Sequence, residues 1–143
     1  ISSIIQIKKY CKINKRKFFL SNNFKVALKL GLDGVYLPSF NNDLKHLNYP
    51  KRKNFLIMGS AHNLKEIKNK ELQKVDIIFI ASLFNKKKTY LGINKFKLLT
   101  QLTKKRIIAL GGINQKNIKL LNLLKIFGYS GITLFGSKKN GPQ

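Results

Sequence analysis

The chain has 143 residues, of which 43% are hydrophobic, so its composition is that of a globular protein and excludes general disorder. No apolar stretch approaches the roughly 20 residues that a transmembrane helix needs, and no signal peptide is visible, so no membrane partner is expected. The formal net charge is +24, because 29 Lys and Arg residues stand against only 5 Asp and Glu residues.

This charge raises nucleic-acid binding as an alternative, because clustered cations release counterions from a phosphate backbone. Two features weigh against a specific nucleic-acid partner. Proteins that recognise nucleic-acid bases and phosphates favour the guanidinium group of arginine, whereas the arginines here are only Arg16, Arg52 and Arg106. The lysines are also scattered over every expected helix. We therefore expect the positive field to attract phosphorylated small molecules rather than one nucleic-acid sequence.

The single cysteine, Cys11, excludes an internal disulfide and fits a reducing, cytoplasmic location. Its place on a helical stripe with Ile4 and Ile7 predicts core packing rather than a nucleophile. The chain begins at Ile1, already inside a helix-like segment, which we interpret as the start of an incomplete product.

Continuous apolar runs predict six buried strands, at residues 17–21, 34–37, 55–59, 76–81, 106–110 and 131–135. Helical patterns lie between them, at residues 3–12, 24–30, 63–73, 94–104 and 115–127. A weak helical turn is expected at residues 43–47.

Residue types at the helix ends support these boundaries. Asn63 followed by Glu66 resembles a capping box, with Leu64, Ile67 and Leu72 expected on the inner face of the helix. Other expected boundary residues are the N-cap Asn114 and the helix C-caps Gly31 and Gly128.

The most informative segment is the double-glycine turn at Gly111-Gly112, between the strand at 106–110 and the helix at 115–127. Uncovered backbone N–H groups at a helix N-terminus bind phosphate, because the orphan donors and the helix dipole both face the anion. A second turn of this kind, at Gly136-Ser137, follows the next strand. Paired loops after the last two strands form the usual phosphate pocket of a (β/α)8 barrel.

Strict alternation of strands and helices predicts an α/β fold with a mostly parallel sheet. A dinucleotide-binding fold would need a glycine-rich turn after its first strand, where this chain has Ser21-Asn22-Asn23. The late glycine turns favour a TIM (β/α)8 barrel instead. We therefore predict one domain over residues 1–143, a partial barrel with six parallel strands, corresponding to strands 3 to 8 and lacking the first two βα units.

Four segments, in chain order, resemble the thiamine-phosphate synthase/TenI family of small (β/α)8 barrels. Residues 28–37 look like the family's ALxLGADGVHL, and Gly59-Ser60-Ala61-His62 looks like its GVSAH turn. Residues 75–92 look like ADYVGxGPVF…TK…LG, and residues 109–113 and 128–137 look like AIGGI and GADGVAVVSAI. The family's Gln-x-Arg-x-Lys strand, which contributes to its pyrophosphate site, has no counterpart here.

The resemblance implies the family's chemistry, in which a pyrimidine diphosphate is joined to a thiazole phosphate and pyrophosphate is released, with Mg²⁺. Ser60 corresponds to the serine that contacts pyrophosphate, and Lys88, after a one-residue slip, to the loop lysine that neutralises the leaving group. A serine that starts a helix, a solvated lysine and a purely structural turn remain the alternatives. The implied substrate-binding residues are Ser21, Asn22, Gly111, Gly112, Gly136 and Ser137.

The chain departs from the family at the metal. The family's Asn-Asp pair after its third strand is Ser21-Asn22 here, and its second metal-binding aspartate falls at Asn41. Mg²⁺ prefers carboxylate oxygens, and we expect only Asp43 to lie beyond the carboxyl end of a strand. Unless Asp43 substitutes by loop slippage, the resemblance implies Mg²⁺ without its carboxylate ligands.

The histidines favour no second activity. The TenI branch uses a histidine where this chain has Ser82, while His62 is expected to cap or pack and His46 to lie on the surface. Three hypotheses remain: a thiamine-phosphate synthase-like enzyme, a non-catalytic or altered member that keeps the phosphate cradle, and a basic nucleic-acid-binding protein. An open six-strand sheet would expose its edges, so a homo-oligomer is also among the expected partners.

Overall fold

The computed structural model describes residues 1–86, 88–131 and 134. These residues fall into two compact units, Ile1–Ile78 and Phe79–Gln143. Within the described part of the chain, no helix combines the length and apolar character needed to cross a membrane.

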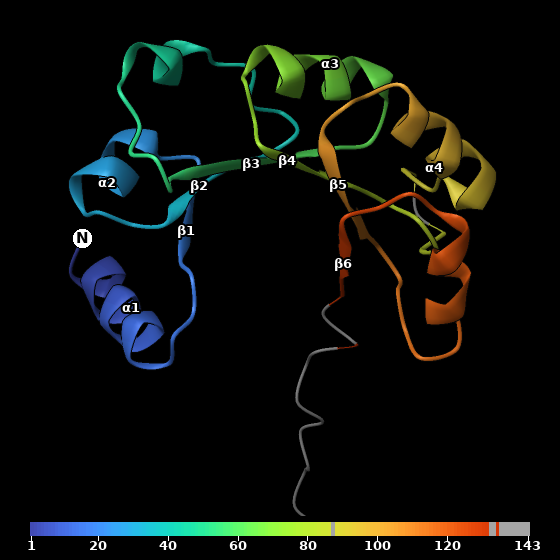
Figure 1. The fold of residues 1–143 in the computed structure, drawn as a ribbon, viewed down its shortest axis with the longest axis horizontal. Helices are drawn as coiled ribbons and strands as arrows, with labels where there is room; N and C mark the ends of the chain where they lie inside the picture. The colour runs from blue at the N-terminus through green and yellow to red at the C-terminus, as the bar shows by residue number, and fades with distance from the viewer. Residues whose placement is uncertain (87, 132–133, 135–143) are drawn as a thin grey trace, which may run out of the picture. The chain divides into compact units, whose positions relative to one another are not determined.

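Strands and helices alternate along the chain (Figure 1). The strands are β1 (Phe19–Ser21), β2 (Gly34–Leu37), β3 (Leu56–Ala61), β4 (Ile77–Ile80), β5 (Arg106–Leu110) and β6 (Gly128–Ser130). The α-helices are α1 (Ser2–Ile13), α2 (Phe24–Lys29), α3 (Leu64–Leu72) and α4 (Gly92–Gln101). Two short 3₁₀ helices are η1 (Lys45–Asn48) and η2 (Ile118–Leu123).

The strand order is the sequence order, β1-β2-β3-β4-β5-β6. The pairs β1–β2, β2–β3 and β5–β6 are parallel. The predicted α/β fold of six parallel strands alternating with helices is therefore confirmed.

The register of β1, β2 and β3 divides their side chains between two faces, because successive residues of a strand alternate. Leu20 pairs with Val35, and Leu37 pairs with Gly59, so these residues share one face. A Cβ atom at Gly59 would lie 2.7 Å from Cδ of Lys70 in α3, so this face is the one that the helix covers. It supplies the core of the unit: Val35, Leu37, Ile57 and Ala61 are each at most 3% exposed.

Two aspartates anchor the amino ends of the strands. The Asp33 carboxylate accepts the backbone N–H of Phe18 at 2.8 Å, and that of Asp76 accepts the N–H of Ile57 at 2.8 Å. Lys51 also contacts the Asp76 carboxylate, at 3.2 Å. Parallel α/β folds bind ligands at the opposite, carboxyl end of their strands. These two carboxylates therefore stabilise the sheet and are placed away from a candidate site.

In the second unit, β5 has the predicted bounds, and the last described strand begins earlier than the one predicted at 131–135. Strand β6 spans Gly128–Ser130, and residues 132, 133 and 135 lie outside the described residues. The N–H of Phe127 donates to the carbonyl of Ile107 at 2.8 Å, so the chain has already joined β5 before Gly131. Gly128 is thus a strand residue, and its predicted role as a helix C-cap is wrong.

The helix predicted at 115–127 is a 3₁₀ helix of six residues, η2. Asparagine side chains compete for the backbone at its start. Asn114 Oδ1 accepts the N–H of Lys116, and Asn117 Oδ1 accepts the N–H of Asn114, each at 2.9 Å. Such local bonds offer the chain an alternative to the α-helical ladder. Asn114 therefore forms a turn, and the prediction that it is the N-cap is wrong.

Two predictions of burial also fail. In α3, Ile67 is buried as expected, but Leu64 is 40% and Leu72 is 64% exposed, while Lys70 is fully buried. The structure thus places a lysine, whose polar partners are described below, where helical periodicity predicts only apolar residues. Helix α1 has no buried residue, and Cys11 is half-buried rather than part of the core.

Replacement of Gly34 by alanine tests the packing that sets the sheet register. Its Cβ would lie 2.0 Å from the carbonyl oxygen of Leu56 and 2.8 Å from the Phe19 ring. We expect Gly34→Ala to lower the free energy of unfolding, measured by urea denaturation, by about 3 kcal/mol or more. Gly128→Ala is the control, because nothing lies within 4 Å of its Cβ position. Equal stability of the two variants would contradict the register.

Candidate functional site

Serine side chains share the face of the sheet that α3 leaves uncovered. Ser21 pairs with Tyr36, and Tyr36 pairs with Met58, so the three form a row across β1, β2 and β3. Ser60 lies two residues beyond Met58 in β3 and therefore on the same face, nearer to the carboxyl end. Ser21 and Ser60, which the resemblance marks as site residues, thus lie on one face toward the carboxyl edge, meaning the strand ends and the residues that follow them.

Asn22 and Asn41 meet at this edge, although they lie 19 positions apart in the sequence. The Asn41 side-chain amide, through Nδ2, donates to Oδ1 of Asn22. Asn22 has a left-handed φ of 57°, a conformation that Asn tolerates better than most residues. The two positions that the resemblance assigns to metal-binding aspartates are therefore in direct contact, as an amide pair.

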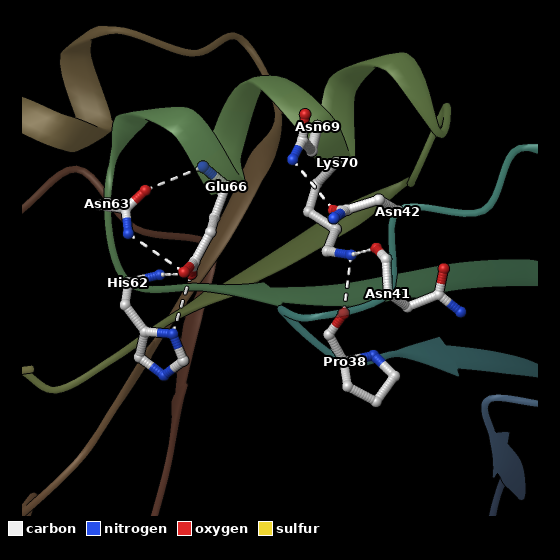
Figure 2. Close-up of polar contacts among 8 residues, drawn as sticks. All are labelled: Pro38, Asn41, Asn42, His62, Asn63, Glu66, Asn69 and Lys70. Atoms are coloured by element: carbon white, nitrogen blue, oxygen red, sulfur yellow. Dashed lines mark hydrogen bonds and ion pairs between the residues drawn. The ribbon is translucent and has the colours of Figure 1, made fainter.

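Lys70 reaches from α3 to the loop that follows β2 (Figure 2). Its ammonium donates to the carbonyls of Pro38 and Asn41, both at 2.8 Å, and to Oε1 of Gln73 at 2.7 Å. The Gln73 amide donates in turn to the carbonyls of Asn41 and Asp43, both at 3.0 Å. The loop at 38–43, and Asn41 with it, is held by these two side chains.

His46 extends this network, so the prediction that it lies on the surface is wrong. The residue is 7% exposed, and its ring Nε2 lies 2.8 Å from the carbonyl oxygen of Gln73. Its ring also packs on that of Phe24, with 5.4 Å between the centroids. The imidazole is buried because it satisfies a backbone carbonyl and fills an aromatic cluster at the same time.

Burial lowers the pKa of the Lys70 amino group from its usual 10.5 to about 8. The loss of water around the ammonium is the main cause, and the carboxylate of Glu66 opposes it. At neutral pH the group therefore keeps its proton, and the loop after β2 rests on a buried positive charge.

The expectation that only Asp43 lies beyond a strand's carboxyl end is wrong, because Glu66 also reaches this edge. Its carboxylate accepts the N–H of His62, the residue directly after β3, at 2.7 Å and lies 2.9 Å from the ring Nδ1 (Figure 2). Asn63 Oδ1 accepts the N–H of Glu66 at 2.9 Å, an N-cap bond that contributes about 1 kcal/mol. The sequence signal for this contact between Glu66 and the His62 ring is the capping pattern Asn63-x-x-Glu66 directly after the histidine.

A cavity of about 270 Å³ lies beside the amide pair and is bounded by the start of α2 and by residues 41–49. Asn22 and Asn41 line it together with Lys25, Lys45 and Asp43. Two ammonium groups against one carboxylate give the lining a positive balance, which favours an anionic ligand.

The double-glycine turn of the second unit is tightly packed. Gly111 and Gly112 have φ values of +105° and +75°, and a Cβ at Gly111 would lie 2.5 Å from Oγ of Ser82. A Cβ at Gly112 would lie 2.7 Å from the backbone nitrogen of Asn85. The N–H of Phe84 donates to the carbonyl of Gly111 at 2.8 Å. Close packing on residues 82–85 therefore requires glycine here, and phosphate binding by this turn stays a prediction.

The structure gives less information on the other predicted site residues. Lys88 is exposed. Gly136 and Ser137 lie outside the described residues. The predicted convergence of two glycine turns on one phosphate therefore stays a prediction.

The two positions at which the resemblance implies metal ligands, Asn22 and Asn41, do not fit a Mg²⁺ ion. Within the described ranges, no group of three or more His, Cys, Asp or Glu side chains could hold a metal. Asp43, the carboxylate that slippage could supply, accepts the N–H of Lys45 at 2.8 Å and lies 3.9 Å from its ammonium. Asn22 and Asn41 offer neutral amides beside the buried ammonium of Lys70, whereas Mg²⁺ is held by carboxylates and substrate phosphates.

Comparisons with known proteins agree with the fold and with the resemblance. A family model described as thiamine monophosphate synthase matches residues 1–134. The thiamine-phosphate synthase of Latilactobacillus sakei is 27% identical over 93% of this chain and 62% of its own length. That of Prochlorococcus marinus is 30% identical over 100% of this chain and 41% of its own length. The chain therefore spans only about half of these relatives.

A solved structure gives the same fold. The thiamine phosphate pyrophosphorylase from Pyrococcus furiosus matches with a TM-score of 0.69 and 22% identity, over 86% of this chain and 60% of that chain. At this identity the match shows the fold alone. None of these matches supports the nucleic-acid-binding alternative.

Replacement of Lys70 by methionine tests the support of the loop after β2. The variant keeps most of the side chain's bulk but leaves Oε1 of Gln73 without its donor and removes one of the two donors to the carbonyl of Pro38. We expect Lys70→Met to lower the free energy of unfolding at pH 7 by about 2 kcal/mol or more. Lys65→Met, at an exposed position of the same helix, should change it by less than about 0.5 kcal/mol. Similar values for the two variants would contradict the role of Lys70.

The lowered pKa of Lys70 gives a further prediction. A group with a pKa of about 8 when folded and 10.5 when unfolded binds more protons in the unfolded state between these pH values. Stability from this group should therefore rise with pH, by roughly 3 kcal/mol between pH 8 and 10.5. We compare the free energies of unfolding of the wild type and Lys70→Met, measured by urea denaturation across this pH range. The contributions of the other lysines cancel in the difference. The stability gap should widen with pH, and a constant gap would contradict the shift.

Proposed function

Because the chain belongs to the thiamine monophosphate synthase family, we propose that it joins a pyrimidine diphosphate to a thiazole phosphate in thiamine biosynthesis. The observation that carries the proposal is the family match over residues 1–134. The grouping of Ser21, Asn22, Asn41 and Ser60 toward the carboxyl edge of the first unit supports it.

In the proposed reaction, the C–O bond between the pyrimidine methylene and the diphosphate breaks, and its electron pair leaves with pyrophosphate. The thiazole nitrogen then supplies a lone pair to the methylene carbon and becomes a thiazolium. No proton has to be transferred, so the protein acts by positioning the reactants and neutralising the departing charge. The hydroxyl of Ser60 would donate a hydrogen bond to the pyrophosphate, and the ammonium of Lys88 would neutralise part of its charge.

The acceptor would be held through its phosphate. We assign this role to Gly111 and Gly112 with Gly136 and Ser137, whose backbone N–H groups would face the dianion. Ser21 and Asn22 would contact the other substrate at the carboxyl edge of β1. No step of this mechanism uses a metal ion, because the donor set at Asn22 and Asn41 does not fit one.

The amide pair also favours a second candidate, a family member that binds the phosphorylated ligands without turnover. The two candidates share a ligand class and differ only in product formation. A cytoplasmic location and a homo-oligomeric state stay predictions.

The test is formation of thiamine phosphate by the protein expressed from its complete reading frame. Ser60→Ala and Lys88→Ala should each lower kcat/KM by about 10- to 100-fold, because each removes a group that stabilises the leaving charge. Lys86→Ala, at another exposed lysine of the same loop, is the matched control and should keep the wild-type rate. Thiazole phosphate binding without product in the wild type would favour the non-catalytic member. Full activity in both variants would remove Ser60 and Lys88 from the mechanism.

A further inference from the structure

We propose that the Asn22–Asn41 amide pair replaces a divalent cation, so that the loops after β1 and β2 are joined by a direct hydrogen bond instead of a metal bridge. The inference rests on the proposed function only in treating this edge as the phosphate-binding edge. Its test reads metal binding, so it can fail independently of product formation.

The orientation of the Asn41 side chain is fixed by its partners. Its Oδ1 accepts the N–H of Asp43 at 2.8 Å and the side-chain amide of Gln73 at 3.0 Å. Both contacts need an oxygen at this position, so the amide nitrogen must be the atom that faces Asn22. That nitrogen donates to Oδ1 of Asn22, which completes a donor-to-acceptor chain from Gln73 through Asn41 to Asn22.

Two carboxylates at these positions would place two acceptors against each other. Like charges at hydrogen-bond distance repel, and the contact then needs a shared proton or a cation between the groups. An amide pair removes this requirement, because one side chain supplies the donor and the other the acceptor. The hydrogen bond therefore does at this edge what a bridging ion does between carboxylates.

The surroundings also disfavour a cation. The Lys70 ammonium, which is fully buried, lies 2.8 Å from the backbone carbonyl of Asn41. A positive charge fixed on the backbone of Asn41 repels a divalent ion near the side chain of the same residue, and burial reduces the screening of that repulsion. The Lys70 contact and the amide pair are thus mutually consistent.

Backbone conformation does not explain the amide at residue 22. Its φ of 57° lies in the left-handed region, which both Asn and Asp visit. Replacement of Asn22 by aspartate is therefore mild for the backbone. The difference between the two residues at this position lies in charge and in hydrogen-bond donors.

The experiment makes two measurements on the wild type, a test variant and a control variant. Electron paramagnetic resonance gives the affinity for Mn²⁺, and thermal denaturation gives the Tm in EDTA and in Mn²⁺. The test variant is Asn22→Asp/Asn41→Asp. The matched control is Asn23→Asp/Asn42→Asp, which adds the same charge one residue along each loop. In the wild type, Oδ1 of Asn23 accepts the N–H of Val26, and Oδ1 of Asn42 accepts from Asn69, so aspartate preserves both control contacts.

We expect the test variant to bind Mn²⁺ at least about tenfold more tightly than the control, a difference of about 1.4 kcal/mol. Its Tm should be low in EDTA and rise with Mn²⁺, while the wild-type Tm should be the same in both. Wild-type Mn²⁺ binding as tight as that of the test variant would overturn the proposal, and so would equal binding by test and control.

A single variant keeps the proposal falsifiable if the double variant does not fold. Asn41→Ala removes the donor, so its Tm should fall by the same amount in EDTA and in Mn²⁺. If the wild type is instead stabilised by Mn²⁺ and Asn41→Ala loses that stabilisation, a metal joins the loops and the proposal is wrong.

Discussion

The buried ammonium of Lys70 is the contact on which the carboxyl edge of the first unit depends. It can cross β3 because Gly59 has no side chain at the point where the lysine stem passes. Gln73, three residues later in the sequence, accepts one of its bonds and donates to the same loop. Burying the charge is unfavourable, as the lowered pKa shows, but the ammonium is compensated by three acceptors: the carbonyls of Pro38 and Asn41 and Oε1 of Gln73. Lys70 and Gln73 therefore hold the loop after β2 in addition to the turn bonds within the loop itself.

The sequence predicts best those elements whose signal lies in the residues of the element itself or next to it. Strands β2 and β5 have the predicted bounds because a glycine or proline stops each apolar run: Pro38 follows Leu37, and Gly111 follows Leu110. The helix predicted after Gly112 fails because asparagine turn bonds override the apolar period. Lys70 was missed because its acceptors at Pro38 and Asn41 lie about 30 residues away, in a loop without periodicity.

In the candidate site too, contacts with a local signal could be predicted and contacts between distant residues could not. Ser21 and Ser60 could be placed on one face, because strand register alone relates them. The contact between Asn22 and Asn41 could be anticipated only through the resemblance, which made both positions ligands of one ion. The bond from Glu66 to His62 had a local signal in the capping pattern, whereas the tight packing of Gly111 on Ser82 had none.

Most of the few carboxylates of this chain accept backbone N–H groups. Four of the five accept backbone N–H groups: Asp33 from Phe18, Asp43 from Lys45, Glu66 from His62 and Asp76 from Ile57. The fifth, Glu71, pairs with Lys68 at 2.8 Å. A carboxylate that accepts a backbone N–H stabilises the fold whatever the ligand, so it is costly to lose even in a strongly basic chain. The two positions that have amides instead, Asn22 and Asn41, are those where a carboxylate would need a cation beside it. The buried ammonium of Lys70 at the same edge disfavours such a cation.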